Sequence, residues 1–234
     1  MIYVLISDIH GAFNTLQALL VKVAAQLGDQ PYEVILLGDL IDRGPRSREV
    51  VEWAMTNKIR TTKGNHEDLA LAYSEHAKMG FKAKCARHYD RNVWLLNGGD
   101  DTLKSWGPKT KTLPRDVLEW MSDLPPYILI EEPTSENRKL LCSHTGYGLD
   151  ADKDNWLRAL WGRYPDDGDW THEKGTGKAI DDGLFRCFGH TKTRKVEVMP
   201  AHVNIDSGAA YRGYEVMTAF VWPSKQLIQV SYQD

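Results

Sequence analysis

The sequence of 234 residues predicts an α/β fold organised around a parallel sheet. In its first part, three short apolar runs alternate with two amphipathic patterns of helical period, which is the order in which a parallel sheet is built. From Tyr127 onward, strand-like runs predominate. Because no internal repeat, low-complexity tract or clear linker interrupts the chain, we expect a single domain over residues 1–234.

The elements expected in the first part end at glycine or polar residues. Leu16, Leu19 and Val23 share one stripe of a helix expected from about Asn14 to Leu27. Ser47 is expected to cap a second helix. The expected strands here are Ile2–Ile6, Val34–Leu37 and Ile59–Thr62.

The middle of the chain is less regular. Residues 68–124 are expected to be mainly helical, with Pro114 in the first turn of the last helix. From Lys78 to Arg115 there are nine Lys or Arg against three Asp, so residues 78–115 are locally basic. Solvated helix faces are the preferred interpretation, and a cap that attracts anionic substrates is the alternative. The later expected strands are Tyr127–Ile130, Leu140–Cys142, Arg186–Phe188, Val196–Met199, Val203–Ile205, Tyr214–Val221 and Leu227–Tyr232.

Composition excludes several classes of protein. A hydrophobic content of 42% and a charged content of 26% are those of an ordinary soluble globular protein. The net charge of -3 argues against a nucleic-acid binder, and no run approaches a membrane span or a signal-peptide core. Three widely spaced cysteines predict reduced thiols and a cytoplasmic setting, with Cys142 and Cys187 packed in the core.

Residues typical of metal sites follow five of the apolar runs. Ligands bind at the carboxyl ends of strands in open α/β sheets, so these ends can bring their side chains to one place. Four of the eight histidines have this placement, which a polar sheet edge alone does not explain. The residues concerned are Asp8, His10, Asp39, Asn65, His66, His144 and His190.

This set of oxygen and nitrogen donors, without a thiolate motif, favours Mn²⁺, Fe or Zn²⁺ over Ca²⁺. Seven candidate ligands are too many for one ion and suit two, which requires a bridging carboxylate. The stretch Gly38–Gly44 places Asp39 and Asp42 beside Arg43, whose guanidinium suits phosphate oxygens. Taken alone, this stretch is best interpreted as a surface turn with an ion pair. The other four strand ends make a metal and phosphate site the better interpretation.

The same residues resemble a known family. Ser7–Gly11, Gly38–Gly44 and Gly64–Glu67 are similar, in order and separation, to the GDxHG, GDxxDRG and GNHE motifs of the PPP-type metallophosphatases. Ser143-His144 and Gly189–Thr191 resemble the two later histidine motifs of these calcineurin-like phosphoesterases, so the resemblance covers about the first 210 residues. The sequence is most similar to the compact phage and bacterial phosphatases typified by bacteriophage lambda protein phosphatase.

The resemblance implies the fold and the metal centre. The expected architecture is a central β-sandwich of mixed sheets flanked by α-helices, with the site at one edge. Two divalent ions are implied, Mn²⁺ first and Fe or Zn²⁺ as alternatives, and a hydroxide that bridges them would attack phosphorus in line. Asp39 would bridge the two ions. The further ligands implied are Asp8 and His10 for the first ion, and Asn65, His144 and His190 for the second.

The resemblance also implies roles around the phosphate. His66 would protonate the leaving alkoxide, Asp42 would hold its imidazole, and Arg43 would neutralise the phosphoryl oxygens. Arg163 resembles a second phosphate-binding arginine, although only a local Trp-x-Arg pattern supports it and an ion pair with Asp166 or Asp167 is the alternative. The residues expected to contact the phosphate are Arg43, Asn65, His66 and Arg163. Two departures from the family pattern, Ser7 for glycine and Thr145 for a small residue, fall outside the ligand positions.

Three functions are weighed. The first is a phosphomonoesterase, specifically a serine/threonine protein phosphatase acting on a phosphorylated protein or a small phosphoester. The second is a nucleotide hydrolase like the symmetrical diadenosine tetraphosphatases, which commonly carry Gln where this chain has His10. The intact His10 therefore favours the phosphatase. The third is a non-catalytic interaction module, which should have lost ligands or His66 and is disfavoured because none is lost.

Overall fold

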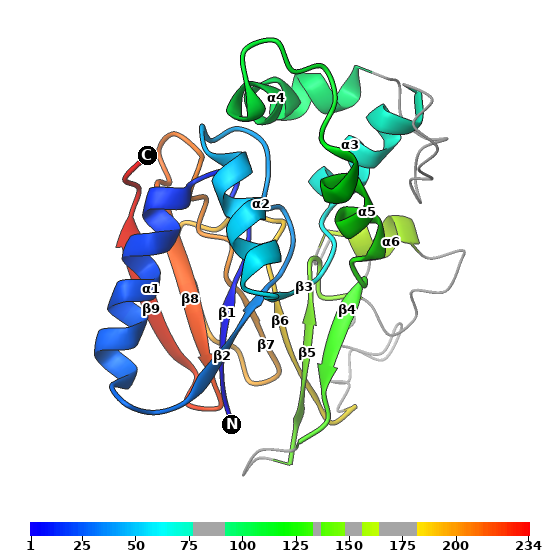
Figure 1. Ribbon diagram of the computed structural model, residues 1–234. Coiled ribbons are helices and arrows are strands. Elements are labelled where there is room, and N and C mark those ends of the chain that lie inside the picture. Colours follow the sequence, from blue (N-terminus) through cyan, green and yellow to red (C-terminus); the bar gives the residue numbers. More distant parts are fainter. Residues whose placement is uncertain (77–91, 133–136, 148–155, 164–181) are drawn as a thin grey trace.

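The computed structural model describes residues 1–76, 92–132, 137–147, 156–163 and 182–234 as two packed β-sheets with helices against them (Figure 1). The first sheet has the order β3-β2-β1-β8-β9 and the second the order β4-β5-β6-β7. The strands of the first sheet are β1 (Ile2–Ile6), β2 (Tyr32–Leu36), β3 (Arg60–Thr61), β8 (Val216–Trp222) and β9 (Gln226–Ser231). The strands of the second are β4 (Tyr127–Ile130), β5 (Lys139–Ser143), β6 (Leu184–Phe188) and β7 (His202–Asn204).

Helices cover one face of the first sheet and one end of the sandwich. The described helical elements are α1 (Phe13–Leu27), α2 (Ser47–Thr56), α3 (Asn65–His76), the π-helical turn η2 (Leu95–Gly99), α4 (Asp100–Trp106), α5 (Arg115–Asp123) and α6 (Trp156–Trp161). Helix α1 packs on β8 and β9, while α3 to α5 gather near the end of the sandwich opposite the N-terminus (Figure 1). No helix in the described part of the chain is long and apolar enough to cross a membrane.

Both sheets are mixed, which confirms the predicted fold class. Strands β1, β2 and β3 run parallel, joined by α1 and α2, and β8 pairs antiparallel with both β1 and β9. In the second sheet β4 is antiparallel to β5, whereas β5, β6 and β7 are parallel. Alternate residues of β1 therefore face different layers: Val4 and Ile6 face the helices, and Tyr3 and Leu5 face the second sheet.

Two local expectations are wrong. Val196–Met199 is not a strand, because only Val198 bridges to Val203, while Lys195 and Glu197 pair with each other at the surface. Ser47 does not cap α2. Its hydroxyl instead accepts a hydrogen bond from the backbone of Asp42 at 3.1 Å, so it supports the functional site.

The buried cysteines and one tryptophan behave as core residues. Cys142 and Cys187 are free thiols in the core between the sheets, as predicted. Burial raises the pKa of the Cys142 thiol. Cys85 lies outside the described residues. Trp106, which precedes a glycine and a proline, packs against the core under the helices.

Candidate metal and phosphate site

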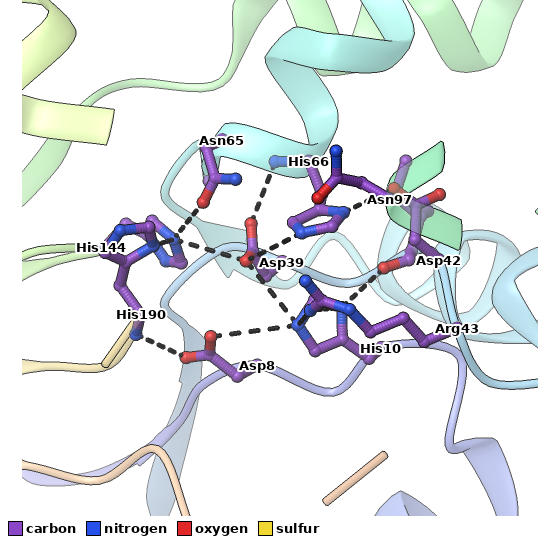
Figure 2. Close-up of polar contacts among 12 residues, drawn as sticks. Asp8, His10, Asp39, Asp42, Arg43, Asn65, His66, Asn97, His144 and His190 are labelled. Atoms are coloured by element: carbon purple, nitrogen blue, oxygen red, sulfur yellow. Dashed lines mark hydrogen bonds and ion pairs between the residues drawn. The ribbon is translucent and has the colours of Figure 1, made fainter. Parts of the chain in front are cut away.

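The five predicted strand ends meet at one edge of the sandwich (Figure 2). Loops after β1, β2 and β3 bring residues from the first sheet, and loops after β5 and β6 bring them from the second. The carboxyl ends of these parallel strands point the same way, which is why residues far apart in sequence converge. The predicted ligands brought together are Asp8, His10, Asp39, Asn65, His144 and His190. All of them are buried except His190, which is partly buried.

Asp39 lies at the centre of the group. Its Oδ2 atom is 3.4 Å from Nε2 of His144, 3.7 Å from Nε2 of His10 and 3.8 Å from Nε2 of His66. Its other oxygen accepts the backbone N–H of His66 at 3.0 Å, in the first turn of α3. One carboxylate oxygen is thus tied to a helix start and the other faces three imidazoles.

The first donor group contains Asp8 and His10. The Nδ1 atom of His10 lies 2.8 Å from the carbonyl oxygen of Ile41 and can donate a hydrogen bond to it. The lone pair of this imidazole is then on Nε2, on the side of Asp39, where a metal ion could use it. Oδ1 of Asp8 is 4.0 Å from this Nε2, and Oδ2 of Asp8 accepts the backbone N–H of His190 at 3.0 Å. Asp8 therefore ties the first group to the second.

The second donor group is built on His144. Its Nδ1 atom lies 2.9 Å from the carbonyl oxygen of Leu37, and its Nε2 lies 3.0 Å from Oδ1 of Asn65 and 3.1 Å from Nδ1 of His190. The Nε2 atom of His190 is buried and has no hydrogen-bond partner in the described part of the chain. Converging donors and an orphaned buried nitrogen fit a metal ion, which would coordinate atoms that otherwise crowd one another.

The charges at the site also fit cations. Burial raises the pKa of Asp8 well above its usual range, and the carboxylate of Asp206 raises it further. Burial and the carboxylate of Asp39 raise the pKa of Asp206 to about 6. Burial would also raise the pKa of Asp39, but the rings of His144 and His66 outweigh it and hold the pKa well below the usual range. Three buried carboxylates cost free energy unless positive charge compensates them.

The imidazoles differ in protonation. Burial lowers the pKa of His10, and the charge of Arg43 lowers it further, so His10 is neutral as a metal ligand must be. Burial and His144 lower the pKa of His190 to about 3. Burial opposes protonation of His144, but the Asp39 carboxylate outweighs it and raises the pKa of His144 to about 10. A cation bound beside Asp39 would supply the positive charge that this proton supplies here.

His66 and Asp42 form a hydrogen-bonded pair at the edge of the group. Nδ1 of His66 lies 2.5 Å from Oδ2 of Asp42. Asp42 also accepts hydrogen bonds from Nε1 of Trp94 at 3.0 Å and from the hydroxyl of Thr102 at 2.6 Å. Because Asp42 is held from three sides, the imidazole of His66 has a fixed orientation with Nε2 toward Asp39.

The guanidinium of Arg43 lies against the imidazole of His10. Its Nη1 atom contacts Nε2 of His10, and its backbone N–H reaches the carbonyl of Gly98 at 3.4 Å. Gly98 has φ +103 and carries no side chain because a Cβ would lie 2.7 Å from the nitrogen of Arg43. The turn η2 thus packs its backbone directly on the phosphate-binding arginine that the sequence predicts.

Arg163 follows α6 and is exposed. Its charge contributes to lowering the pKa of His190, which places it within electrostatic reach of the second donor group. The ring of Trp161 meets His190 edge-on, with 6.2 Å between centroids. This position suits the predicted phosphate-binding role. Asp166 and Asp167, the alternative partners, lie outside the described residues.

The backbone around the site is unusual. Ten described residues other than glycine have positive φ, and six of them are at the site. Such conformations cost about 1–3 kcal/mol each and persist where the surrounding structure enforces them. The six are Asp8, His10, Asp39, Asp42, Arg43 and His190.

Comparison with known proteins decides the family. The model of the calcineurin-like phosphoesterases matches residues 1–220. The chain belongs to this family. The enzyme is therefore a metallophosphoesterase, as the sequence motifs predict.

Two curated relatives align with most of this chain and with most of their own length. A bis(5'-nucleosyl)-tetraphosphatase PrpE [asymmetrical] of Anoxybacillus flavithermus is 28% identical over 98% of this chain and 94% of its own. Serine/threonine-protein phosphatase 2 of Escherichia coli is 28% identical over 89% of this chain and 88% of its own. A protein serine/threonine phosphatase structure from Saccharomyces cerevisiae, at 15% identity, covers 100% of this chain and 80% of its own with a TM-score of 0.54, which shows the fold alone. The narrower likeness to lambda phosphatase stays a prediction.

Several residues of this phosphoesterase site were missed by sequence reasoning. Glu67 accepts backbone N–H groups from Asp39, Leu40 and Gly64 at 2.8–2.9 Å, so it joins the loops after β2 and β3. Its place in the third motif was the available signal. Trp94 and Thr102 carried no local pattern, because they act only through Asp42. Asp206 follows an apolar run, as the predicted ligands do, and the same rule applied once more would have found it.

Metal removal should change both stability and activity of the phosphoesterase. We expect dialysis against a chelator to abolish hydrolysis of p-nitrophenyl phosphate, and Mn²⁺ to restore it. Mn²⁺ at 100 times its dissociation constant should stabilise the fold by about 2.7 kcal/mol per site, or roughly 5–10 °C in melting temperature. Ca²⁺ should give a smaller shift because the donors include imidazoles. Equal shifts with Mn²⁺ and Ca²⁺ in differential scanning calorimetry would contradict a nitrogen-containing site.

Proposed function

We propose that the protein is a dinuclear-metal phosphohydrolase. The observation that carries this is the position of Asp39 Oδ2, which faces Nε2 of His10, His66 and His144 within 3.8 Å. One carboxylate is therefore shared by two donor groups, as a bridging ligand must be. Bound divalent cations would neutralise the phosphoryl oxygens and acidify the attacking water. The proposed ligands are Asp8, His10 and Asp39 for one ion, and Asp39, Asn65, His144 and His190 for the other.

The remaining residues orient the phosphate and move a proton. Arg43 is half-buried, so its guanidinium can bind phosphoryl oxygens in a partly desolvated place where charge-assisted bonds are strong. Nδ1 of His66 is held by Asp42, which leaves Nε2 to deliver a proton to the leaving oxygen. Asn65 and Arg163 complete the proposed phosphate contacts on the side of the second donor group.

For the substrate we propose a dinucleoside tetraphosphate, cleaved asymmetrically into a nucleoside triphosphate and a nucleoside monophosphate. The Anoxybacillus relative is named for this activity and aligns along nearly the whole of both chains. The intact His10 favours a phosphatase only over the symmetrical tetraphosphatases and does not bear on the asymmetrical type.

Phosphoserine and phosphothreonine proteins are the second candidate. The pair of His66 and Asp42 supports it, since an alkoxide leaving group needs a proton more than a nucleotide does. The Escherichia coli relative, named as a serine/threonine-protein phosphatase, supports it as well.

A direct comparison tests the two substrates. With the metal-loaded protein in Mn²⁺, we expect kcat/KM for diadenosine tetraphosphate to exceed that for a phosphoserine peptide by about tenfold or more, because extra phosphates contribute binding. Chromatography should show ATP and AMP as the products. A reversed ratio would establish the phosphatase instead, and two ADP would contradict asymmetrical cleavage.

A further inference from the structure

Three cations and two tyrosines form a row that leads away from the phosphoesterase site. The guanidinium carbon of Arg43 lies 4.5 Å from the ring centroid of Tyr211, and Nζ of Lys192 lies 4.1 Å from the same centroid. Lys192 is also 6.0 Å from the ring of Tyr214, which the guanidinium carbon of Arg194 approaches to 4.9 Å. We call these five residues the cation row. It begins at the phosphate-binding arginine and ends at Arg194.

The loop that carries both tyrosines is fixed by its own hydrogen bonds. The backbone N–H of Tyr211 donates to Gly208 at 3.0 Å, and that of Tyr214 donates to Tyr211 at 3.0 Å. Gly208 has φ +73, and a Cβ there would lie 2.5 Å from Cβ of Tyr214. Arg194 Nη1 donates to the carbonyl of Gly213 at 3.2 Å. The rings are therefore held in place as supports for the cations.

No carboxylate in the described part of the chain forms an ion pair with Arg43, Lys192 or Arg194. The nearest acids lie on the side of the metal site, where the carboxylate of Asp206 is within electrostatic reach of Lys192 and, with Asp8 and Asp39, of Tyr211. A cation on a surface ring contributes only about 0.5–1 kcal/mol, whereas like charges in line repel one another. Such a row attracts anions, and an extended anion gains most because it meets all three charges.

A cavity of about 140 Å³ adjoins the far end of the row. Its size suits a phosphate group and not a nucleoside, since pockets for drug-sized ligands start at about 300 Å³. Arg194 is the charged residue of its wall. The lining residues are Arg194, Ser207, Gly213, Tyr214, Val216 and Gln229.

We propose that the cation row binds the distal phosphates of a nucleoside polyphosphate whose reacting phosphate lies at Arg43. This inference rests on the proposed function and deepens it by assigning a binding site for the rest of the chain of phosphates. A phosphomonoester reaches Arg43 but gains nothing from Lys192 and Arg194. The row thus determines specificity for polyphosphates over single phosphate groups.

The double variant Lys192→Ala/Arg194→Ala tests the assignment. In Mn²⁺, we expect its ratio of kcat/KM for diadenosine tetraphosphate to that for p-nitrophenyl phosphate to fall about tenfold, mainly through KM of the tetraphosphate. Lys195→Ala is the matched control, because Lys195 is exposed on the same segment but pairs with Glu197 at 2.7 Å. The control should keep the wild-type ratio. An unchanged ratio in the double variant would overturn the proposal.

A second measurement separates this proposal from the proposed substrate. Inorganic tripolyphosphate, at fixed free Mn²⁺, should inhibit p-nitrophenyl phosphate hydrolysis more tightly than phosphate does, and the double variant should lose about tenfold of that inhibition. The wild type could fail to cleave the tetraphosphate and still be inhibited more tightly by tripolyphosphate than by phosphate, with the double variant losing that inhibition. In that case the proposed substrate is wrong and the cation row is still a polyphosphate-binding site. Equal inhibition of wild type and variant by tripolyphosphate would remove the row as a binding site.

Discussion

Replacing Asp39 by asparagine is expected to abolish metal-dependent hydrolysis of p-nitrophenyl phosphate, with kcat reduced by about a thousandfold or more. The Oδ2 atom of Asp39 faces three imidazoles within 3.8 Å, so it is the atom that joins the two donor groups. An amide has no charge with which to hold two cations. Steady-state kinetics across a Mn²⁺ titration would measure the loss, which excess metal should not rescue.

The fold should survive Asp39→Asn. An amide oxygen can still accept the N–H of His66, and the sheets and cores lie behind the site. The melting temperature without metal should therefore stay within a few degrees, while the rise on adding Mn²⁺ should shrink. Asp29→Asn makes the same chemical change at an exposed turn and serves as the control. Near-normal turnover by Asp39→Asn would remove Asp39 from the bridging position.

The convergence of the proposed ligands could be predicted from sequence because they obey a simple rule. A strand that ends in a parallel sheet delivers the next polar side chain to a common edge. Asp8, Asp39 and His144 can therefore be recognised from the few residues that precede each of them. The register of β1 and β2, which sets Ile6 opposite Leu36, then places their following residues side by side. The hydrophobic period and the order of the strands along the chain were sufficient to predict that these side chains converge.

The support behind the ligands follows no such rule. Thr102 donates to Asp42 across 60 positions of sequence, and Trp94 does so across 52. Trp94 directly precedes the π-helical turn η2 and Thr102 lies in the short helix α4, and the packing of both elements depends on the complete fold. Ser47 shows the same difficulty, since a helix-capping pattern concealed a hydroxyl used at the site. Local chemistry predicts which groups a site contains, whereas tertiary packing decides which neighbours hold them.

His66→Asn is expected to slow substrates according to their leaving groups. A phosphoserine peptide, which must release an alkoxide, should lose about 10²–10⁴-fold in kcat, the range typical of a general acid. p-Nitrophenyl phosphate and diadenosine tetraphosphate release stabilised anions and should lose about tenfold or less. His202→Asn, at the start of β7 and away from the site edge, is the matched control and should behave as wild type.

The pattern of rate losses in His66→Asn distinguishes a general acid from a metal ligand, and the geometry of His66 allows both roles. Nε2 of His66 is 3.8 Å from Oδ2 of Asp39, so distance alone also suits a metal ligand grouped with His10. A lost ligand weakens metal binding and slows every substrate alike, and added Mn²⁺ would partly restore the rate. Loss of a general acid leaves the rate almost unchanged for substrates whose leaving group needs no proton, and added metal does not restore the rate for the others. Since Nδ1 is already held by Asp42, as in a positioned acid, we expect the second pattern. Equal losses on all three substrates would make His66 a ligand and leave the leaving group to be protonated by water.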